Sequence, residues 1–241
     1  METIKKWLED ATFPQDQRRP LVTLSYAQSL DGSLAVERGH RTLISGEESM
    51  RLTHLIRAQH DAILVGIGTV LSDNPQLTVR LSPGKSPRAV VLDSRLRIPL
   101  ECNLLQRKDH RMIVFSGRGV EAGKQAALEK KGAVVLENEA TPGQPINLKE
   151  ALGALWEHGI RKLMVEGGAK VIASFLNERL VDRAVITIAP FWLGGLALIG
   201  QPLVQNLGIS SPAVLPSIRE PSVEILGSDI IIYGQVGEVQ P

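Results

Sequence analysis

The sequence predicts one α/β domain with a mostly parallel central sheet, helices flanking it, and a C-terminal antiparallel hairpin. Three observations support this prediction. Short apolar runs alternate with amphipathic helical patterns, which is typical of parallel strands buried on both faces. Two of the helical patterns end at Gly132 and Gly159, where a left-handed residue commonly closes a helix. Near the end of the chain, only a Gly-Ser-Asp turn separates two strand-like runs.

The expected elements follow this alternation along the chain. The expected strands are Leu21–Ala27, Ala62–Val65, Ala89–Leu92, Met112–Phe115, Val134–Leu136, Lys162–Val165 and Ala184–Ile188, followed by the hairpin of Val223–Leu226 and Ile230–Tyr233. The expected helices are 2–10, Glu47–Gln59 with Ser45 as N-cap, Glu121–Lys131, Leu148–His158 and Ala169–Leu180. Residues 1–18 are expected to form an N-terminal arm, with one domain over 19–241. The long connection Phe191–Pro221, rich in glycine and proline, has a length that suggests function.

Composition and charge exclude several classes of protein. The chain has 27 basic and 26 acidic residues, so its net charge of +1 provides no general attraction to nucleic acid or an anionic membrane. The single cysteine, Cys102, cannot form an internal disulfide or a cysteine-based zinc site. The five histidines lack metal-ligand spacing, so no metal is expected. Since no long apolar span or secretory signal is present, a cytoplasmic location is expected.

Two glycine-containing turns mark the expected carboxyl edge of the sheet, where open α/β sheets bind ligands. Val165-Glu-Gly-Gly-Ala169 leads from a strand into a helix, whose N–H groups favour an anion, and Glu166 can accept hydrogen bonds from a ligand. A tight turn with a solvated Glu166 explains the pattern equally well. In the second turn, Val65–Leu71, leucine stands where a dinucleotide fingerprint has its third glycine, so a plain turn is favoured there.

Taken together, several segments closely resemble the riboflavin-biosynthesis pyrimidine reductases. They include Asp61-Ala-Ile-Leu-Val-Gly-Ile-Gly-Thr-Val-Leu-Ser-Asp-Asn-Pro-Gln-Leu-Thr-Val-Arg80, with Arg19–Gly32, Ile44–Gly46, Leu55–Ala58, Val165–Gly168, Ala189–Gly195 and Leu226–Gly234 in the same order. The resemblance implies a dihydrofolate-reductase-like fold and a homodimer. It also implies reduction of the ribosyl group of a ribosylaminopyrimidine 5′-phosphate to a ribityl group with NADPH.

The resemblance further implies roles for individual positions. The cofactor-binding positions are Ala27, Leu43, Thr69, Asp73, Ser94, Arg95, Gly167, Gly168, Ala169, Lys170, Val171, Ile172, Ala173 and Ser174. The substrate-binding positions are Arg41, Arg57, Leu77, Arg80 and Glu166. Within these sets, Ser94 and Arg95 are expected at the adenosine 2′-phosphate, and Arg57 and Arg80 at the ribose phosphate. Glu166 and Asp31 are the expected catalytic residues, and Asp73 and ordered water are further candidates for the proton donor.

One stretch departs from the family pattern and leaves alternatives open. In Arg41-Thr-Leu-Ile-Ser45, Arg41 and Leu43 replace a polar substrate contact and a residue that lines the nicotinamide. The alternatives are a same-fold NADPH reductase for a pterin-like compound or specialised pathway intermediate, and a non-catalytic dinucleotide-binding paralogue. The zinc deaminase signature of fused homologues is also missing from this sequence. The enzyme is therefore expected to act before deamination or to receive its substrate from a separate deaminase.

Overall fold

The described residues form one nine-stranded sheet with the order β5-β4-β3-β2-β6-β1-β7-β9-β8. The structure is a computed structural model that describes residues 1–10, 18–34, 44–194 and 216–238. The strands are β1 (Leu21–Ser29), β2 (Ala62–Gly66), β3 (Arg88–Leu92), β4 (Ile113–Ser116), β5 (Val134–Glu137), β6 (Lys162–Val165), β7 (Arg183–Ala189), β8 (Pro216–Leu226) and β9 (Asp229–Glu238). Strands β1 to β7 pair in parallel, and the β8–β9 hairpin adds antiparallel to β7. The predicted α/β fold class is therefore confirmed.

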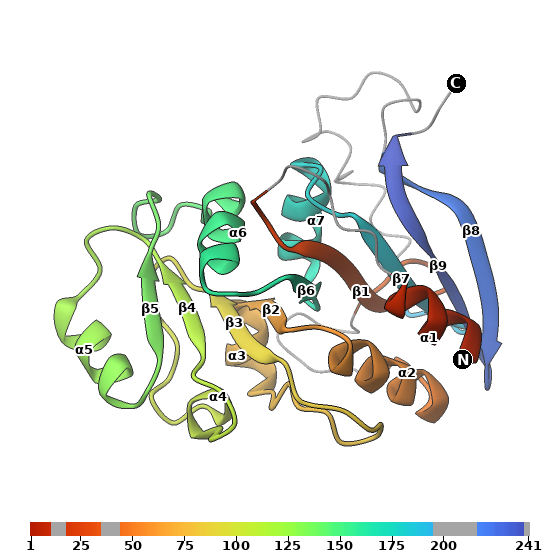
Figure 1. Ribbon diagram of the computed structural model, residues 1–241, viewed down its shortest axis with the longest axis horizontal. Coiled ribbons are helices and arrows are strands. Elements are labelled where there is room, and N and C mark those ends of the chain that lie inside the picture. Colours follow the sequence, from red (N-terminus) through yellow and green to blue (C-terminus); the bar gives the residue numbers. More distant parts are fainter. Residues whose placement is uncertain (11–17, 35–43, 195–215, 239–241) are drawn as a thin grey trace.

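Helices cover both faces of this sheet (Figure 1). They are α1 (Glu2–Glu9), α2 (Glu47–Ala58), α3 (Ile67–Asp73), α4 (Asn103–Gln106), α5 (Ala122–Lys130), α6 (Leu148–Glu157) and α7 (Ala169–Asn177). Helices α1 to α5 pack on one face with Val65 and Val91, whereas α6 and α7 pack on the other face with Leu64 and Val90. Consecutive strand residues thus enter opposite cores, because side chains alternate along a strand and both faces are covered.

Helix α1 belongs to the first of these cores. Its Ile4 and Leu8 are almost completely buried. Trp7 packs against Tyr233 of β9 with ring centroids 5.2 Å apart, and the Arg183 guanidinium donates to the Trp7 carbonyl at 2.8 Å. The segment expected to form an N-terminal arm therefore contains a helix that packs directly on the domain.

The structure corrects several expected elements. Helix α3 follows β2 directly, so the second glycine turn opens a helix and is not a plain turn. Strand β8 begins at Pro216 and takes in the last residues of the expected connection, whose residues 195–215 lie outside the described part of the chain. The N-cap of α2 is Gly46 and not Ser45, because the Gly46 N–H donates to Asp229 Oδ2 at 2.8 Å and fixes the chain there.

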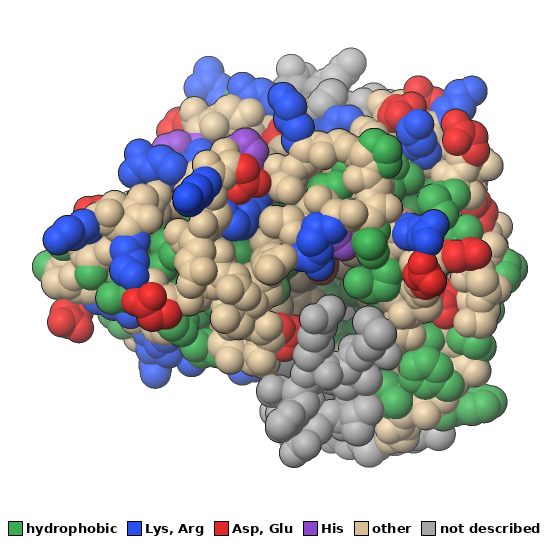
Figure 2. Space-filling view, turned by 90° about the horizontal axis from the view of Figure 1, so that it is seen from below, with side chains coloured by type: hydrophobic (Ala, Val, Ile, Leu, Met, Phe, Trp, Pro, Cys, Tyr) green, Lys and Arg blue, Asp and Glu red, His purple; other side chains and the backbone are tan. Residues whose placement is uncertain are grey.

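Basic and acidic side chains are intermixed on the face drawn in Figure 2, and no large patch of one charge covers it. This agrees with the net charge of +1. Within the described ranges, every helix is too short or too polar to cross a membrane.

The buried His60 gives the fold a pH dependence. Its Nδ1 lies 2.7 Å from the Ile56 carbonyl oxygen and its Nε2 lies 2.8 Å from Thr23 Oγ1, between α2 and β1. Burial lowers the pKa of His60 to about 4, and the nearby Lys162 and Arg183 charges act in the same direction. Between pH 6.5 and 4 the unfolded chain therefore binds a proton that the folded chain rejects, so stability falls as the pH falls.

We expect His60 to account for a loss of roughly 2 kcal/mol between pH 7.5 and pH 5. Urea unfolding at both pH values measures this loss for the wild type and for His60→Gln, which should lose less by that amount. The exposed His158 provides the control, because His158→Gln should keep the wild-type dependence. Equal losses in wild type and His60→Gln would contradict the prediction.

Candidate active site

Two residues predicted to contact substrate form an ion pair at the middle of the sheet. Arg57 lies in the last turn of α2, and Glu166 directly follows β6. Arg57 Nε donates to Glu166 Oε2 at 2.9 Å, and Nη2 donates to Oε1 at 2.5 Å. The Arg57 side chain is 9% exposed and that of Glu166 is 27% exposed. The planar Arg57 guanidinium therefore fixes the Glu166 carboxylate with two parallel hydrogen bonds and leaves part of it accessible to a ligand.

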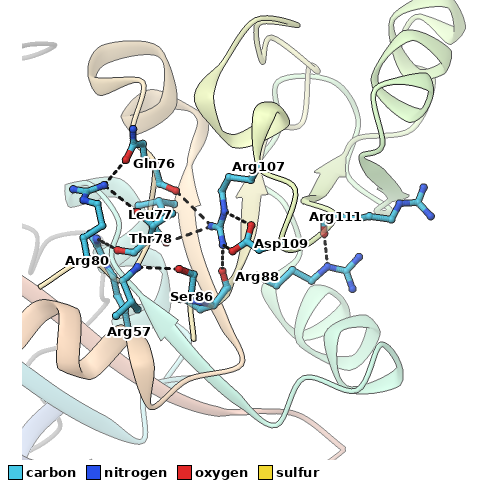
Figure 3. Close-up of polar contacts among 12 residues, drawn as sticks. Arg57, Gln76, Leu77, Thr78, Arg80, Ser86, Arg88, Arg107, Asp109 and Arg111 are labelled. Atoms are coloured by element: carbon cyan, nitrogen blue, oxygen red, sulfur yellow. Dashed lines mark hydrogen bonds and ion pairs between the residues drawn. The ribbon is translucent and has the colours of Figure 1, made fainter. Parts of the chain in front are cut away.

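The other two described substrate positions, Leu77 and Arg80, lie on an irregular segment after α3. Arg57 reaches this segment as well, because its Nη1 donates to the Thr78 carbonyl at 3.2 Å. Leu77 is buried with a left-handed backbone (φ 52°). Arg80 is exposed, and its Nη1 donates to Gln76 Oε1 at 2.5 Å and to Thr78 Oγ1 at 2.9 Å. Figure 3 shows Arg57 and Arg80 together beside this segment.

His54 is a residue of this site that the sequence analysis did not assign to it. It lies one helical turn before Arg57 on α2, is fully buried, and accepts a hydrogen bond at Nδ1 from the Arg80 backbone N–H at 2.8 Å. Burial, together with the Arg57 and Arg80 charges, lowers the pKa of His54 to about 4. The imidazole is thus neutral at physiological pH. The spacing of three residues from Arg57 is the only sequence signal that links it to the site.

Among the predicted cofactor positions, Thr69 lies in the first turn of α3, and Gly167 to Ser174 extend from the turn before α7 into the middle of that helix. Strands β2 and β6 pair in parallel; α3 begins directly after β2, and α7 begins after the three-residue turn that follows β6. A Cβ on Gly168 would lie 3.8 Å from Thr69 Oγ1, so the two turns face each other closely. The first N–H groups of α7 have no partner within the helix, and Gly168, Ala169 and Lys170 are exposed. This arrangement fits the pyrophosphate of a dinucleotide.

Ser94 and Arg95, predicted at the 2′-phosphate, follow β3 on the far side of β2. Ser94 Oγ accepts from the Gly143 N–H at 3.2 Å. The Arg95 guanidinium lies over Gly143, where a Cβ would collide with its Nη2. Because the sheet order is β3-β2-β6, a ligand that extends from the start of α7 to Arg95 would cross the end of β2. The spacing therefore suits an elongated ligand.

The remaining predicted residues are placed less centrally. Ala27 lies on β1, opposite Thr187 of β7. Asp73 ends α3 and accepts a hydrogen bond from Ser72 Oγ at 2.6 Å. Asp31 Oδ1 accepts from Ser29 Oγ and from the Leu193 N–H, which ties the end of β1 to the segment after β7.

Arg41 and Leu43 lie outside the described residues, so the structure does not place the departure from the family pattern. Among the residues that the structure places, no group of three His, Cys, Asp or Glu side chains could hold a metal ion.

Comparison with known proteins identifies relatives of the whole arrangement. Residues 20–232 match the model of the RibD C-terminal domain. The riboflavin biosynthesis protein RibD of Aquifex aeolicus is 39% identical over 218 residues, which cover 90% of this chain and 58% of that protein. The chain therefore spans less than two thirds of this relative. The 2,5-diamino-6-ribosylamino-4(3H)-pyrimidinone 5′-phosphate reductase of Methanothermobacter thermautotrophicus is 36% identical over 217 residues, covering 89% of this chain and 97% of that protein.

Solved structures agree with these sequence matches. RibD of Acinetobacter baumannii superimposes with a TM-score of 0.75 at 27% identity, covering 92% of this chain and 59% of that chain. The riboflavin biosynthesis reductase Rib7 of Saccharomyces cerevisiae has a TM-score of 0.72 at 27% identity, and 98% of each chain is covered. The similarity to Rib7 therefore extends over nearly the full length of both chains.

The contact between α3 and α7 predicts the effect of a single methyl group. A Cβ on Gly66, the N-cap of α3, would lie 2.8 Å from Val171 Cγ2 in the first turn of α7. We expect Gly66→Ala to displace this turn, to lower the free energy of unfolding by about 1–3 kcal/mol, and to weaken dinucleotide binding. Urea unfolding and a fluorescence titration with NADPH measure the two effects.

Gly153 within α6 provides the matched control, since a Cβ there meets no atom within 4 Å. Gly153→Ala should raise the free energy of unfolding by about 0.5–1 kcal/mol and leave NADPH affinity unchanged. If Gly66→Ala behaves like Gly153→Ala, the close approach of the two helices has no functional role.

Proposed function

The chain belongs to the family of the RibD C-terminal domain, and we propose that it reduces the ribosyl group of a ribosylaminopyrimidine 5′-phosphate to a ribityl group in riboflavin biosynthesis. The proposed reductant is NADPH. The observation that carries this proposal is the ion pair of Arg57 and Glu166. It adjoins the segment with Leu77 and Arg80 through Thr78, and the chain continues from Glu166 directly into the exposed start of α7.

The proposed reaction requires the protein chiefly to hold the substrate and the dinucleotide in a fixed relative position. When bound, NADPH would supply the hydride for reduction of the imine-like C1′ of the opened ribosyl group to CH₂. The chain has to orient both ligands at near-attack distance and exclude water between them.

The two arginines near the substrate have different tasks in this proposal. Arg57 uses Nε, Nη1 and Nη2 within the protein, so its main task is to orient Glu166. Arg80 is exposed and its Nη1 is bonded only to side chains of its own segment, so it is the better partner for the 5′-phosphate. Glu166 then accepts hydrogen bonds from amino groups of the pyrimidine. The proton donor stays a prediction, with Glu166, Asp31, Asp73 and ordered water as the candidates.

A homodimer is also part of the proposal. Strand β8 is an edge of the sheet, and its Val223 and Ile225 are 58% and 63% exposed. Apolar side chains on an exposed sheet edge favour contact with another protein surface, and a second copy of the chain would cover them. The cytoplasmic location and the separate deaminase stay predictions.

Turnover is the direct test of the proposed reaction. We expect oxidation of NADPH, followed at 340 nm, with the aminated or the deaminated ribosylaminopyrimidine 5′-phosphate. Because the diaminopyrimidinone reductase of Methanothermobacter thermautotrophicus resembles the chain over 97% of its length, the aminated compound is the expected substrate. Turnover of the deaminated compound alone would place the reaction after deamination. NADPH binding without turnover of either compound would favour a reductase for another substrate or a non-catalytic paralogue.

Cofactor selectivity tests the predicted role of Arg95. Because a guanidinium binds phosphate and a carboxylate repels it, Arg95→Glu should raise the KM for NADPH about tenfold or more and change the KM for NADH far less. Arg97→Glu is the control, because Arg97 carries the same charge on the same loop and is also exposed. Steady-state kinetics with both dinucleotides give the four comparisons. If Arg95→Glu changed the KM values for NADPH and NADH equally, the assignment of Arg95 to the 2′-phosphate would be wrong.

A further inference from the structure

The backbone of Leu77 to Arg80 is held in place by side chains from elsewhere in the chain. This stretch belongs to no helix or strand. The Leu77 carbonyl accepts from Arg107 Nη1 at 3.3 Å, and the Thr78 carbonyl accepts from Arg57 Nη1 at 3.2 Å. The Val79 N–H donates to Ser86 Oγ at 3.0 Å, and the Arg80 N–H donates to His54 Nδ1 at 2.8 Å. Its conformation therefore depends on four side chains, because no ladder of backbone hydrogen bonds defines it.

Arg107 is the most extensively bonded of the four. Figure 3 shows its guanidinium between the Leu77 segment and the start of β3. Nη2 donates to the Pro87 carbonyl at 2.8 Å and to Asp109 Oδ2 at 2.6 Å, and Nε donates to Asp109 Oδ1 at 3.0 Å. The side chain is only 7% exposed. Asp109 thus orients the Arg107 guanidinium, which in turn bonds the backbone at Leu77 and at Pro87.

The conformation that Arg107 holds is an unfavourable one. Leu77 has φ 52°, in the left-handed region that costs a branched L-residue free energy. Such a residue stays there only when its surroundings fix it. Arg107 bonds its carbonyl on one side, and burial of the leucine side chain holds it on the other.

The surroundings of His54 indicate that it also holds the backbone of this segment in place. It is fully buried, and its Nε2 has no hydrogen-bond partner among the described residues. An unpaired buried polar group is unfavourable for folding, so an apolar side chain would suit this position better on stability grounds alone. What the imidazole provides is Nδ1 as an acceptor for the Arg80 N–H. Burial, together with the Arg57 and Arg80 charges, lowers the pKa of His54 and keeps the imidazole neutral and able to accept.

We propose that Arg107 and His54 are positioning residues for the substrate, which fix the backbone of Leu77 and Arg80 so that these two residues can meet it. The inference rests on the proposed function and assigns neither residue a contact with the reacting atoms. Their loss is expected to weaken binding of the phosphorylated substrate while leaving the dinucleotide site, on α3 and α7, as it is.

His54 is tested with a pair of variants that differ in one acceptor. His54→Leu removes the acceptor, and we expect the KM for the ribosylaminopyrimidine 5′-phosphate to rise about tenfold while the KM for NADPH changes less than about twofold. In His54→Asn the amide oxygen can take the place of Nδ1, so most of the substrate affinity should return. Equal rises in both KM values, or no recovery with asparagine, would overturn the role of His54.

Arg107 is tested against a neighbouring arginine. Lysine cannot bond the Leu77 and Pro87 carbonyls and Asp109 together, so Arg107→Lys should raise the substrate KM about tenfold. Arg111 lies nearby, but it donates to the Gly132 and Ala133 carbonyls, outside this segment. Arg111→Lys should therefore leave the substrate KM unchanged. The same KM in Arg107→Lys and wild type would overturn the proposal.

A binding measurement separates this proposal from the proposed function. Calorimetric titration with ribose 5-phosphate reports on the phosphate site without any turnover. If the wild type binds it but reduces neither pyrimidine, the proposed reaction fails, and the positioning proposal stands or falls on whether Arg107→Lys weakens that binding about tenfold relative to Arg111→Lys. A wild-type chain that neither reacts nor binds ribose 5-phosphate overturns both.

Discussion

The ion pair between Arg57 and Glu166 is the interaction on which the candidate site depends. The Arg57 guanidinium is nearly buried, and its fork neutralises and orients Glu166 after β6 while its remaining nitrogen bonds Thr78. A buried pair of this kind adds little net stability compared with apolar residues, because both ions lose hydration. Loss of Glu166 alone would leave the nearly buried Arg57 charge uncompensated, at a cost of about 3–5 kcal/mol. The pair is therefore better explained by the geometry that it imposes than by the stability that it adds.

Local patterns were enough to predict most of the fold. Both cores are readable from apolar runs of β2 and β3, and Gly132 and Gly159 have the left-handed backbone expected at helix ends (φ 95° and 81°). Helix α3 was missed because it contains Gly68 and β-branched residues, which favour a helix weakly, and burial of Ile67 and Val70 compensates. Strand β8 was expected to be shorter because it contains Pro221, which an edge strand tolerates next to the register shift between Arg219 and Ser222.

The candidate site was predictable only in part, for a different reason. The family resemblance assigned substrate roles to Arg57, Leu77, Arg80 and Glu166. It did not show that Arg57 and Glu166, which are 109 positions apart in the sequence, bond each other. His54 and Arg107 carry no motif at all. His54 bonds a backbone group 26 residues away, and Arg107 bonds backbone carbonyls 20 and 30 residues away. Contacts at such separations produce no periodicity in the sequence, and the three-residue spacing of His54 from Arg57 is the only local signal.

The two halves of the site share one short piece of chain. Glu166 donates its backbone N–H to the Leu64 carbonyl at 3.0 Å, which ties it to β2 while its side chain faces Arg57. Helix α7 begins three residues later at Ala169, within about 11 Å even for fully extended chain. The same stretch therefore fixes a predicted substrate contact and the start of the helix that is proposed to bind the dinucleotide. The proposed hydride transfer needs donor and acceptor carbons about 3–3.5 Å apart, so a short junction between the two sites is a direct way to set their separation.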